Sequence, residues 1–230
     1  MLSVVSTPIG NLGDITLRAL ETLKACDAII CEDTRVAGKL LHLLQLPKKE
    51  LLSFHSFNEH QKLDSLIARL KSGEHMALIS DAGTPGISDP GYLLISKAHE
   101  AGIKVEVVPG PSAFLAALSI SGLPIHHFLY LGFLPEKKGR RTLLESLKVE
   151  ERTVVFYESP HRIERTLSEL AEVLSAEPDR PIVLCRELTK MHEEVIRTTV
   201  GKLGEIMRRI TIKGEFVVVL GAKISLCHAE

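Results

Sequence analysis

The amino-acid sequence predicts an α/β protein with two α/β domains, the first with a mostly parallel sheet and the second with a mixed sheet. Three observations carry this prediction. Short runs of aliphatic and β-branched residues alternate with segments whose apolar residues recur at helical spacing. A rigid Pro-Gly-Pro break follows at residues 109–111. Beyond the break, the runs of strand type come closer together and one of them is polar on both sides.

The first half of the chain alternates predicted strands with predicted helices. The strands are Leu2–Ser6, Ala28–Cys31, Met76–Ser80 and Lys104–Val108. The helices are Ile15–Ala25, Thr34–Leu44, Asn58–Lys71 and Tyr92–Ala101. Because crossover helices pack back onto the strands that they connect, this order favours a parallel sheet covered on both faces.

The second half begins after the break, so we place the domains at residues 1–111 and 112–230. Two helical turns are expected at Ala113–Ile120. The predicted strands are Phe128–Phe133, Thr153–Tyr157, Ile182–Arg186, Glu194–Thr199 and Glu215–Leu220. Polar residues on both sides of Glu194–Thr199 are typical of an antiparallel strand, which indicates a mixed sheet.

Composition excludes several classes of protein. The 230 residues include 28 Lys and Arg against 29 Asp and Glu, so the chain is not a generally basic nucleic-acid coat, although a local basic patch stays possible. No apolar run approaches the roughly 18 residues of a membrane span, and the N-terminus lacks the pattern of a signal peptide. Cys26, Cys31, Cys185 and Cys227 lack metal or disulfide spacing. We therefore expect a soluble cytoplasmic protein with reduced thiols and no metal.

Three loops that follow predicted strands have an unusual composition. They are Ser6–Asp14, Ser80–Gly91 and Pro109–Ala113. Glycine lets the backbone approach a ligand, proline fixes the loop, and ligands of open α/β sheets bind at the carboxyl ends of strands. The phosphate-binding patterns GxxxxGK[ST] and GxGxxG are absent, and the first two loops contain no lysine or arginine. These loops favour a cationic or neutral ligand, the alternative being plain tight turns.

Four long motifs occur in a fixed order along nearly the whole chain. They are Thr7–Leu20, Glu32–Arg35, Ser80–Gly91 and Glu158–Arg162. Together they resemble ribosomal RNA methyltransferases of the tetrapyrrole methylase superfamily, and the resemblance that they carry extends to the stretch Lys213–Leu220. The resemblance implies S-adenosylmethionine as methyl donor, bound in a cleft between two α/β domains, usually in a homodimer. It also implies 2′-O-methylation of a cytidine ribose in the decoding centre of small-subunit rRNA, within the small ribosomal subunit.

The resemblance implies a cofactor site made by loops of both domains. The residues that match its motifs are Pro8, Ala82, Gly83, Thr84, Ile87, Ser112, Ala113, Tyr157 and Leu188. Backbone groups of the glycine-containing loops are expected to fix the amino-acid part of the cofactor, and apolar side chains to enclose its adenine. Asp81 adds a carboxylate beside the charged sulfonium or amino group; the alternative is an Asx-turn that caps the loop.

A general base is needed because the ribose oxygen loses its proton as the methyl group arrives. We expect it among Asp33, His55 and Glu158, with Glu32 and His161 as further candidates. Asp33 also stands where a helix N-cap is expected, so capping is the alternative role for that residue.

A basic run at Glu136–Arg141 is the clearest candidate for RNA phosphate contacts. The predicted RNA-binding residues are Arg35, Lys137, Lys138, Arg140, Arg141 and Arg162. The alternative is a solvated helix start. Two other functions stay open, a tetrapyrrole C-methyltransferase and a ribosome-assembly module that binds the cofactor without turnover.

Overall fold

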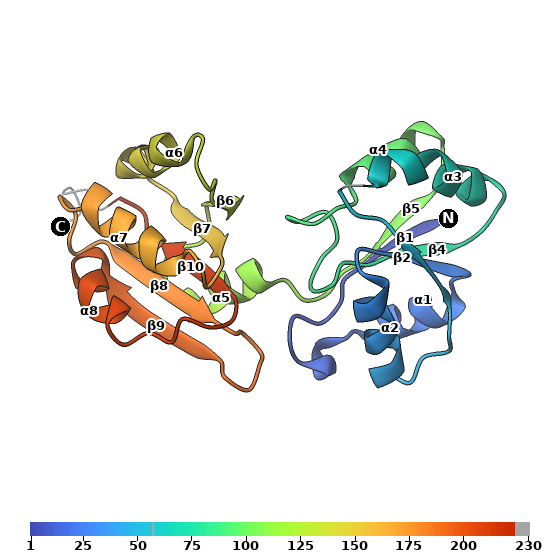
Figure 1. The fold of residues 1–230 in the computed structure, drawn as a ribbon, viewed down its shortest axis with the longest axis horizontal. Coiled ribbons are helices and arrows are strands. Elements are labelled where there is room, and N and C mark those ends of the chain that lie inside the picture. The colour runs from blue at the N-terminus through green and yellow to red at the C-terminus, as the bar shows by residue number, and fades with distance from the viewer. Residues whose placement is uncertain (57, 224–230) are drawn as a thin grey trace. The chain divides into compact units, whose positions relative to one another are not determined.

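The computed structural model describes residues 1–56 and 58–223 and divides the chain into two compact units, Met1–Ser112 and Ala113–Glu230 (Figure 1). Each unit contains one five-stranded sheet. In chain order, the first unit contains β1 (Leu2–Val5), η1 (Leu12–Asp14), α1 (Leu17–Ala25), β2 (Ala28–Cys31), α2 (Thr34–Leu43), β3 (Glu50–Ser53), α3 (Glu59–Lys71), β4 (Met76–Leu78), α4 (Tyr92–Glu100) and β5 (Val105–Val108).

The first sheet has the strand order β3-β2-β4-β1-β5, and every pairing in it is parallel. Figure 1 shows α1 and α2 on one face of this sheet and α3 and α4 on the other. Neighbouring side chains of β2 point to opposite faces of the sheet, since side chains alternate along a strand. Ile30 packs in one apolar cluster with Leu66 of α3. Ile29 packs in another with Leu23 of α1 and Leu41 of α2.

The first two helices begin at capping side chains. The hydroxyl of Thr16 accepts a hydrogen bond of 3.1 Å from the amide of Ala19, and the carboxylate of Asp33 accepts one of 2.8 Å from the amide of Arg35. Each cap satisfies a backbone donor that has no partner inside the helix. The caps fix where each helix starts relative to the strand before it.

The parallel sheet confirms the fold class predicted for the first half, but the prediction lacked β3. This strand pairs only with β2, at the edge of the sheet, and its residues are half-buried or exposed. Edge strands need no continuous apolar run, so Glu-Leu-Leu-Ser gave no strand signal.

The second unit forms a mixed sheet with the order β6-β7-β10-β8-β9. Its elements are α5 (Ala113–Ser121), β6 (Phe128–Phe133), α6 (Arg140–Ser146), η2 (Leu147–Val149), β7 (Thr153–Glu158), α7 (Ile163–Val173), β8 (Pro181–Arg186), β9 (Glu194–Thr199), η3 (Val200–Lys202), α8 (Leu203–Met207) and β10 (Phe216–Leu220). The pair β6–β7 is parallel and the other pairs are antiparallel, as the sequence predicted for a mixed sheet.

Helices α6, α7 and α8 pack on one face of the second sheet, and α5 packs against β7 and β10. None of the helices α6, α7 and α8 was among those that the sequence predicted. The signal was present for α7, because Ile163, Leu167 and Leu170 recur at helical spacing and are fully buried.

Among the described residues, no helix is long and apolar enough to cross a membrane. Cys26, Cys31 and Cys185 are buried free thiols, and Cys227 lies outside the described residues.

Candidate functional site

Three of the loops at the carboxyl edge of the first sheet are joined by hydrogen bonds. Thr7, after β1, donates its amide to the carbonyl of Gly83 at 2.8 Å, and the amide of Gly83 donates back at 3.0 Å. The hydroxyl of Thr84 donates to the carbonyl of Pro111 at 3.2 Å and lies 2.9 Å from the hydroxyl of Ser6. The three loops that the sequence singled out thus form one connected surface beside β4, β1 and β5.

Glycine makes this surface possible at two positions. Gly83 has a φ of +81°, a conformation that L side chains rarely adopt. A Cβ atom at Gly110 would lie 3.0 Å from the Cβ of Ser6, so the two loops touch only because residue 110 has no side chain. The surface therefore offers backbone groups to a ligand, with the partly desolvated carboxylate of Asp81 at its border.

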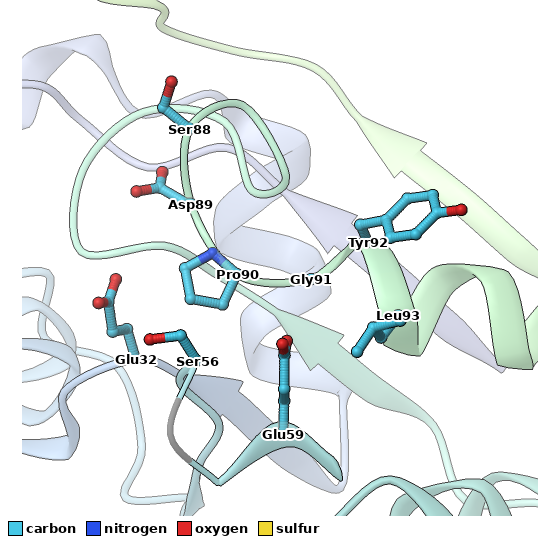
Figure 2. A pocket seen from close by; sticks show the side chains of 9 residues that line it. All are labelled: Glu32, Ser56, Glu59, Ser88, Asp89, Pro90, Gly91, Tyr92 and Leu93. Carbon is cyan, nitrogen blue, oxygen red and sulfur yellow. The ribbon is translucent and has the colours of Figure 1, made fainter. Parts of the chain in front are cut away.

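A pocket of about 450 Å³ lies where the loops after β2, β3 and β4 meet. It is lined by Glu32, Asp33, Thr34, Arg35, Ser53, His55, Ser56 and Asp81. A second pocket, of about 410 Å³, shares Glu32 and Ser56 with the first (Figure 2). Each lining contains three carboxylates, and Arg35 and His55 are the basic side chains among the described residues that form them.

Burial and mutual repulsion raise the pKa values of three of these carboxyl groups. Burial, reinforced by the charge of Asp81, raises the pKa of Glu32. Burial, reinforced by the charge of Glu32, raises the pKa of Asp89 to about 6. Burial also raises the pKa of Asp81. A raised pKa makes a carboxylate a better proton acceptor, as proton transfer from a substrate hydroxyl requires.

Asp33 has the opposite character. Hydrogen bonds from the guanidinium and the amide of Arg35 lower the pKa of Asp33 to about 2. A carboxylate so well stabilised is a poor proton acceptor. The observed contacts are those of the alternative role, the N-cap of α2, and the predicted role as general base does not fit them.

His55 lines the 450 Å³ pocket at the carboxyl end of β3. Its amide donates to Asn58 Oδ1 at 2.9 Å, and its ring Nε2 lies 3.0 Å from Asn58 Nδ2. These contacts hold the backbone and the ring, and the pocket brings His55 together with Glu32.

Glu158 lies inside the second unit, where its side chain is fully buried. One carboxylate oxygen accepts hydrogen bonds from Arg162 Nε at 2.8 Å and the Ser159 amide at 2.9 Å. The other accepts one from Thr166 Oγ1 at 2.7 Å and lies 3.8 Å from Arg140. Because these contacts and the burial leave no side open to a substrate, the structure corrects the prediction that Glu158 is a base.

The basic run at Glu136–Arg141 divides into two kinds of residue. Arg140 is buried and donates to Glu169 at 2.7 Å and to the carbonyl of Pro135 at 3.1 Å. Arg141 is exposed but forms ion pairs with two glutamates on its own and the neighbouring helix. Lys137 and Lys138 are exposed, and no ion pair of theirs is present in the described part of the chain. The burial of Arg140 contradicts its predicted phosphate contact.

The other predicted RNA contacts have partners within the protein. Arg162 pairs with Glu158, donates to the carbonyl of Leu134 at 3.1 Å and is largely buried. Arg35 pairs with Asp33, yet its side chain stays 89% exposed and can reach a ligand.

The remaining predicted cofactor residues lie in both units and differ in burial. Pro8 is buried, Ser112 is half-buried and Ile87 is exposed in the first unit. In the second unit, the hydroxyl of Tyr157 accepts a hydrogen bond of 3.3 Å from the amide of Phe114. Leu188 is buried between two non-glycine residues with positive φ. Ala113 begins α5.

The sequence analysis did not single out Asp89, Glu59 or Tyr92, which line the 410 Å³ pocket. Asp89 carried a signal, because it is the second aspartate of a loop rich in glycine and proline. Glu59 and Tyr92 carried none, since they are the first residues of ordinary helices. Across residues 1–56 and 58–223, no three His, Cys, Asp or Glu side chains are placed to hold a metal ion.

The family model of the Tetrapyrrole (Corrin/Porphyrin) Methylases matches residues 1–204, so the chain belongs to this family. Among curated proteins, it is 46% identical over 225 residues to the Ribosomal RNA small subunit methyltransferase I of Thermotoga maritima, covering 96% of this chain and 98% of that one. It is 50% identical over 203 residues to the protein of the same name from Escherichia coli O157:H7, covering 88% and 70%.

Solved structures share the fold. A uroporphyrin-III-C-methyltransferase from Thermus thermophilus superposes with a TM-score of 0.67 at 24% identity, covering 96% of this chain and 93% of that one. The methyltransferase CobJ gives 0.68 at 20% identity, covering 96% and 93%. A Thermus thermophilus uroporphyrin-III C-methyltransferase complexed with S-adenyl homocysteine gives 0.66 at 20% identity, covering 96% and 96%.

We predict that Asp89→Asn stabilises the protein at alkaline pH. The raised pKa of Asp89 means that the folded state holds the proton more tightly than the unfolded chain, whose pKa is near 3.9. The ionised carboxylate therefore costs stability above about pH 6, and the cost disappears as the pH falls toward about 4. Urea unfolding is expected to give a variant more stable by about 1–3 kcal/mol at about pH 8.

The difference is expected to vanish near pH 4. Asp64→Asn, which removes an exposed carboxylate of α3, is the control and should match the wild type at both pH values. A gain for Asp89→Asn that does not change with pH contradicts the electrostatic origin.

Proposed function

We propose that the protein transfers a methyl group from S-adenosylmethionine to the 2′-oxygen of a cytidine ribose in small-subunit rRNA. The observation that carries the substrate class is the sequence identity of 46–51% to proteins named Ribosomal RNA small subunit methyltransferase I, which extends over most of the chain. The joined loops and the carboxylate-lined pockets beside them supply a site where such chemistry can take place.

The surface beside β4, β1 and β5 fits this cofactor. Backbone groups at Ala82–Thr84 and Ser112 bind its polar amino-acid part, and the absence of lysine and arginine from the Ser6–Asp14 and Ser80–Gly91 loops suits a cationic ligand. Asp81, at the border, compensates positive charge. When bound, the cofactor supplies an electrophilic methyl group on a sulfonium. Pro8, Gly83 and Ile87 stay predicted contacts, as do Ala113, Tyr157 and Leu188 of the second unit.

We propose that the proton of the ribose hydroxyl passes to the pair Glu32 and His55. Both line the 450 Å³ pocket, and the raised pKa of Glu32 suits a group that accepts a proton. Holding the hydroxyl beside the cofactor loops, and away from bulk water, aligns the oxygen for an in-line displacement. Asp33 does not take the proton; as the N-cap it fixes the start of α2, whose first residues are Thr34 and Arg35.

Lys137 and Lys138 are the proposed RNA contacts of the second unit. The loop that carries them is held at its start by Arg162, bonded to the carbonyl of Leu134, and by Arg140, bonded to the carbonyl of Pro135. The two buried arginines are positioning residues, because they fix the loop and leave the lysines exposed. Arg35 is the proposed phosphate contact of the first unit. The homodimer and the cytoplasmic location stay predictions.

The carboxylate lining also bears on the tetrapyrrole alternative. A tetrapyrrole substrate carries many carboxylates and needs cations around it, whereas Glu32, Glu59 and Asp89 line the 410 Å³ pocket and would repel it. We therefore favour the nucleoside, the uncharged part of an RNA substrate, as the group that binds in this pocket.

The direct test uses small ribosomal subunits from cells that lack this gene. We expect the purified protein and radiolabelled S-adenosylmethionine to label one cytidine ribose, mapped by digestion of the rRNA. Cofactor binding measured by calorimetry, without label on subunits or on naked rRNA, contradicts the proposed function; porphyrinoid acceptors then become the test substrates.

The base assignment predicts the outcome of three substitutions. Glu32→Gln or His55→Asn, or both, lowers kcat by about 10²–10⁴-fold, the usual contribution of a general base, with unchanged cofactor affinity. Asp33→Asn is the matched control, because asparagine is as good an N-cap as aspartate. It is expected to keep kcat within a few-fold of the wild type. Full activity of both Glu32→Gln and His55→Asn overturns the assignment.

The lysine assignment predicts a change in salt dependence. Each phosphate contact adds about 0.7–0.9 to the slope of log affinity against log salt concentration. Lys137→Ala combined with Lys138→Ala is therefore expected to reduce the slope by about 1.4–1.8, measured by RNA binding at several salt concentrations. Lys148→Ala, whose side chain pairs with Glu145, is the control and leaves the slope unchanged. An unchanged slope in the double variant contradicts the assignment.

A further inference from the structure

The 410 Å³ pocket has two chemically different ends (Figure 2). Glu32 and Asp89 lie toward one end, and Glu59 extends from the start of α3 toward the loop that carries Gly91. Tyr92 lies at the other end, where its ring extends outward, away from Glu59. The volume falls within the range of about 300–1,000 Å³ that is usual for small-molecule sites.

We propose that this pocket holds the target nucleoside after it leaves the RNA stack: the ribose at the end with Glu32 and Asp89, and the cytosine at the end with Glu59 and Tyr92, where the exposed Tyr92 ring turns to stack on it. The inference rests on the proposed function and names the residues that select the base.

The position of the pocket places the ribose next to the methyl donor. The Ser80–Gly91 loop begins in the joined surface, at Ala82–Thr84, and returns along the pocket at Ser88–Gly91. Ser80 connects the two parts, because its hydroxyl lies 3.2 Å from the carbonyls of Ala82 and Gly83 and also hydrogen-bonds Asp89. Asp89 is therefore tied through Ser80 to the loop that carries the proposed cofactor contacts, and a ribose beside Asp89 extends its 2′-oxygen toward that loop, because transfer needs the oxygen about 3–3.5 Å from the methyl carbon.

The lining favours hydrogen-bond donors. None of its nine residues is a lysine, arginine or histidine, and three are carboxylates. An ionised carboxylate only accepts hydrogen bonds, so it binds ribose hydroxyls and the exocyclic amino group of cytosine. Uracil presents a carbonyl oxygen at the same position, and that oxygen is repelled by Glu59. The phosphates of the nucleotide must lie outside the pocket, near cations such as Arg35.

Tyr92 provides a surface on which a base can stack. It is the first residue of α4, and it is 73% exposed, whereas Tyr130 and Tyr157 belong to an aromatic cluster of the second unit. Unstacked RNA bases are commonly bound on exposed aromatic rings. Gly91 fixes the direction of the helix start, because its φ of +139° is one that L side chains rarely adopt and a Cβ would lie only 3.1 Å from Leu78 Cδ2.

The first test removes the ring. Tyr92→Ala is expected to lower kcat/KM for methylation of small subunits by about 5- to 150-fold, the change that corresponds to the stacking of one base. Tyr92→Phe keeps the ring and is expected to recover most of this loss. Cofactor affinity, measured by calorimetry, is the readout that a general folding defect would change and that the loss of stacking leaves unchanged.

The second test measures base selection. Subunits are reconstituted with the mapped target cytidine or with uridine in its place, and the ratio of the two kcat/KM values is measured for each variant. Glu59→Gln puts an amide donor where the carboxylate stood, so the preference for cytidine is expected to fall by about 5- to 150-fold. Asp64→Asn, on the same helix, is the control and keeps the wild-type ratio. Because the ratio is taken within one preparation, partial unfolding does not affect it.

The outcomes separate the two proposals. If the wild type labels no RNA, the proposed function fails and this inference fails with it. If the wild type labels the cytidine, but Tyr92→Ala keeps its kcat/KM and Glu59→Gln keeps its cytidine preference, the proposed function stands and the nucleoside pocket is overturned.

Discussion

The pair of hydrogen bonds between the backbones of Thr7 and Gly83 is the interaction on which the rest of the site depends. It joins the loop after β1 to the loop after β4, two strands that are neighbours in the sheet but lie far apart in the sequence. The second loop then continues to Asp89 and Gly91. One backbone contact thus links the joined loops on one side to the loop that lines the 410 Å³ pocket on the other.

Charge is arranged differently in the two units, although the whole chain is nearly neutral. In the first unit, burial raises the pKa values of Glu32 and Asp89, and the charge of Asp81 raises both further. In the second, Glu158 is enclosed by arginines and lies in the interior. In the first unit, the carboxylates can accept a proton or a hydrogen bond from a ligand. In the second unit, the carboxylate of Glu158 is buried among ion pairs and holds a loop in place, which is a structural role.

The sequence predicted the parallel first sheet and the mixed second sheet, because buried strands are continuous apolar runs and β9 is polar on both sides. It lacked β3, whose edge position needs no such run. Among the candidate site residues, it could not distinguish Asp33 from Glu32, since both follow β2 and only one meets the guanidinium of Arg35. It also counted Arg140 among the surface cations, because a count of charges contains no burial.

The sequence by itself determined the three unusual loops that the structure joins, because glycine, proline and aspartate at the ends of apolar runs constrain the local backbone whatever surrounds them. It also carries the motifs that relate the chain to its family. Only the tertiary structure decided which charged groups are free to act. That choice depends on neighbours distant in the sequence: Glu158 meets Arg140, and Tyr92 comes to the same pocket as Glu32 and Glu59. Desolvation and Coulomb interactions act through space, so their effect on a side chain follows from the folded contacts and not from its position in the chain.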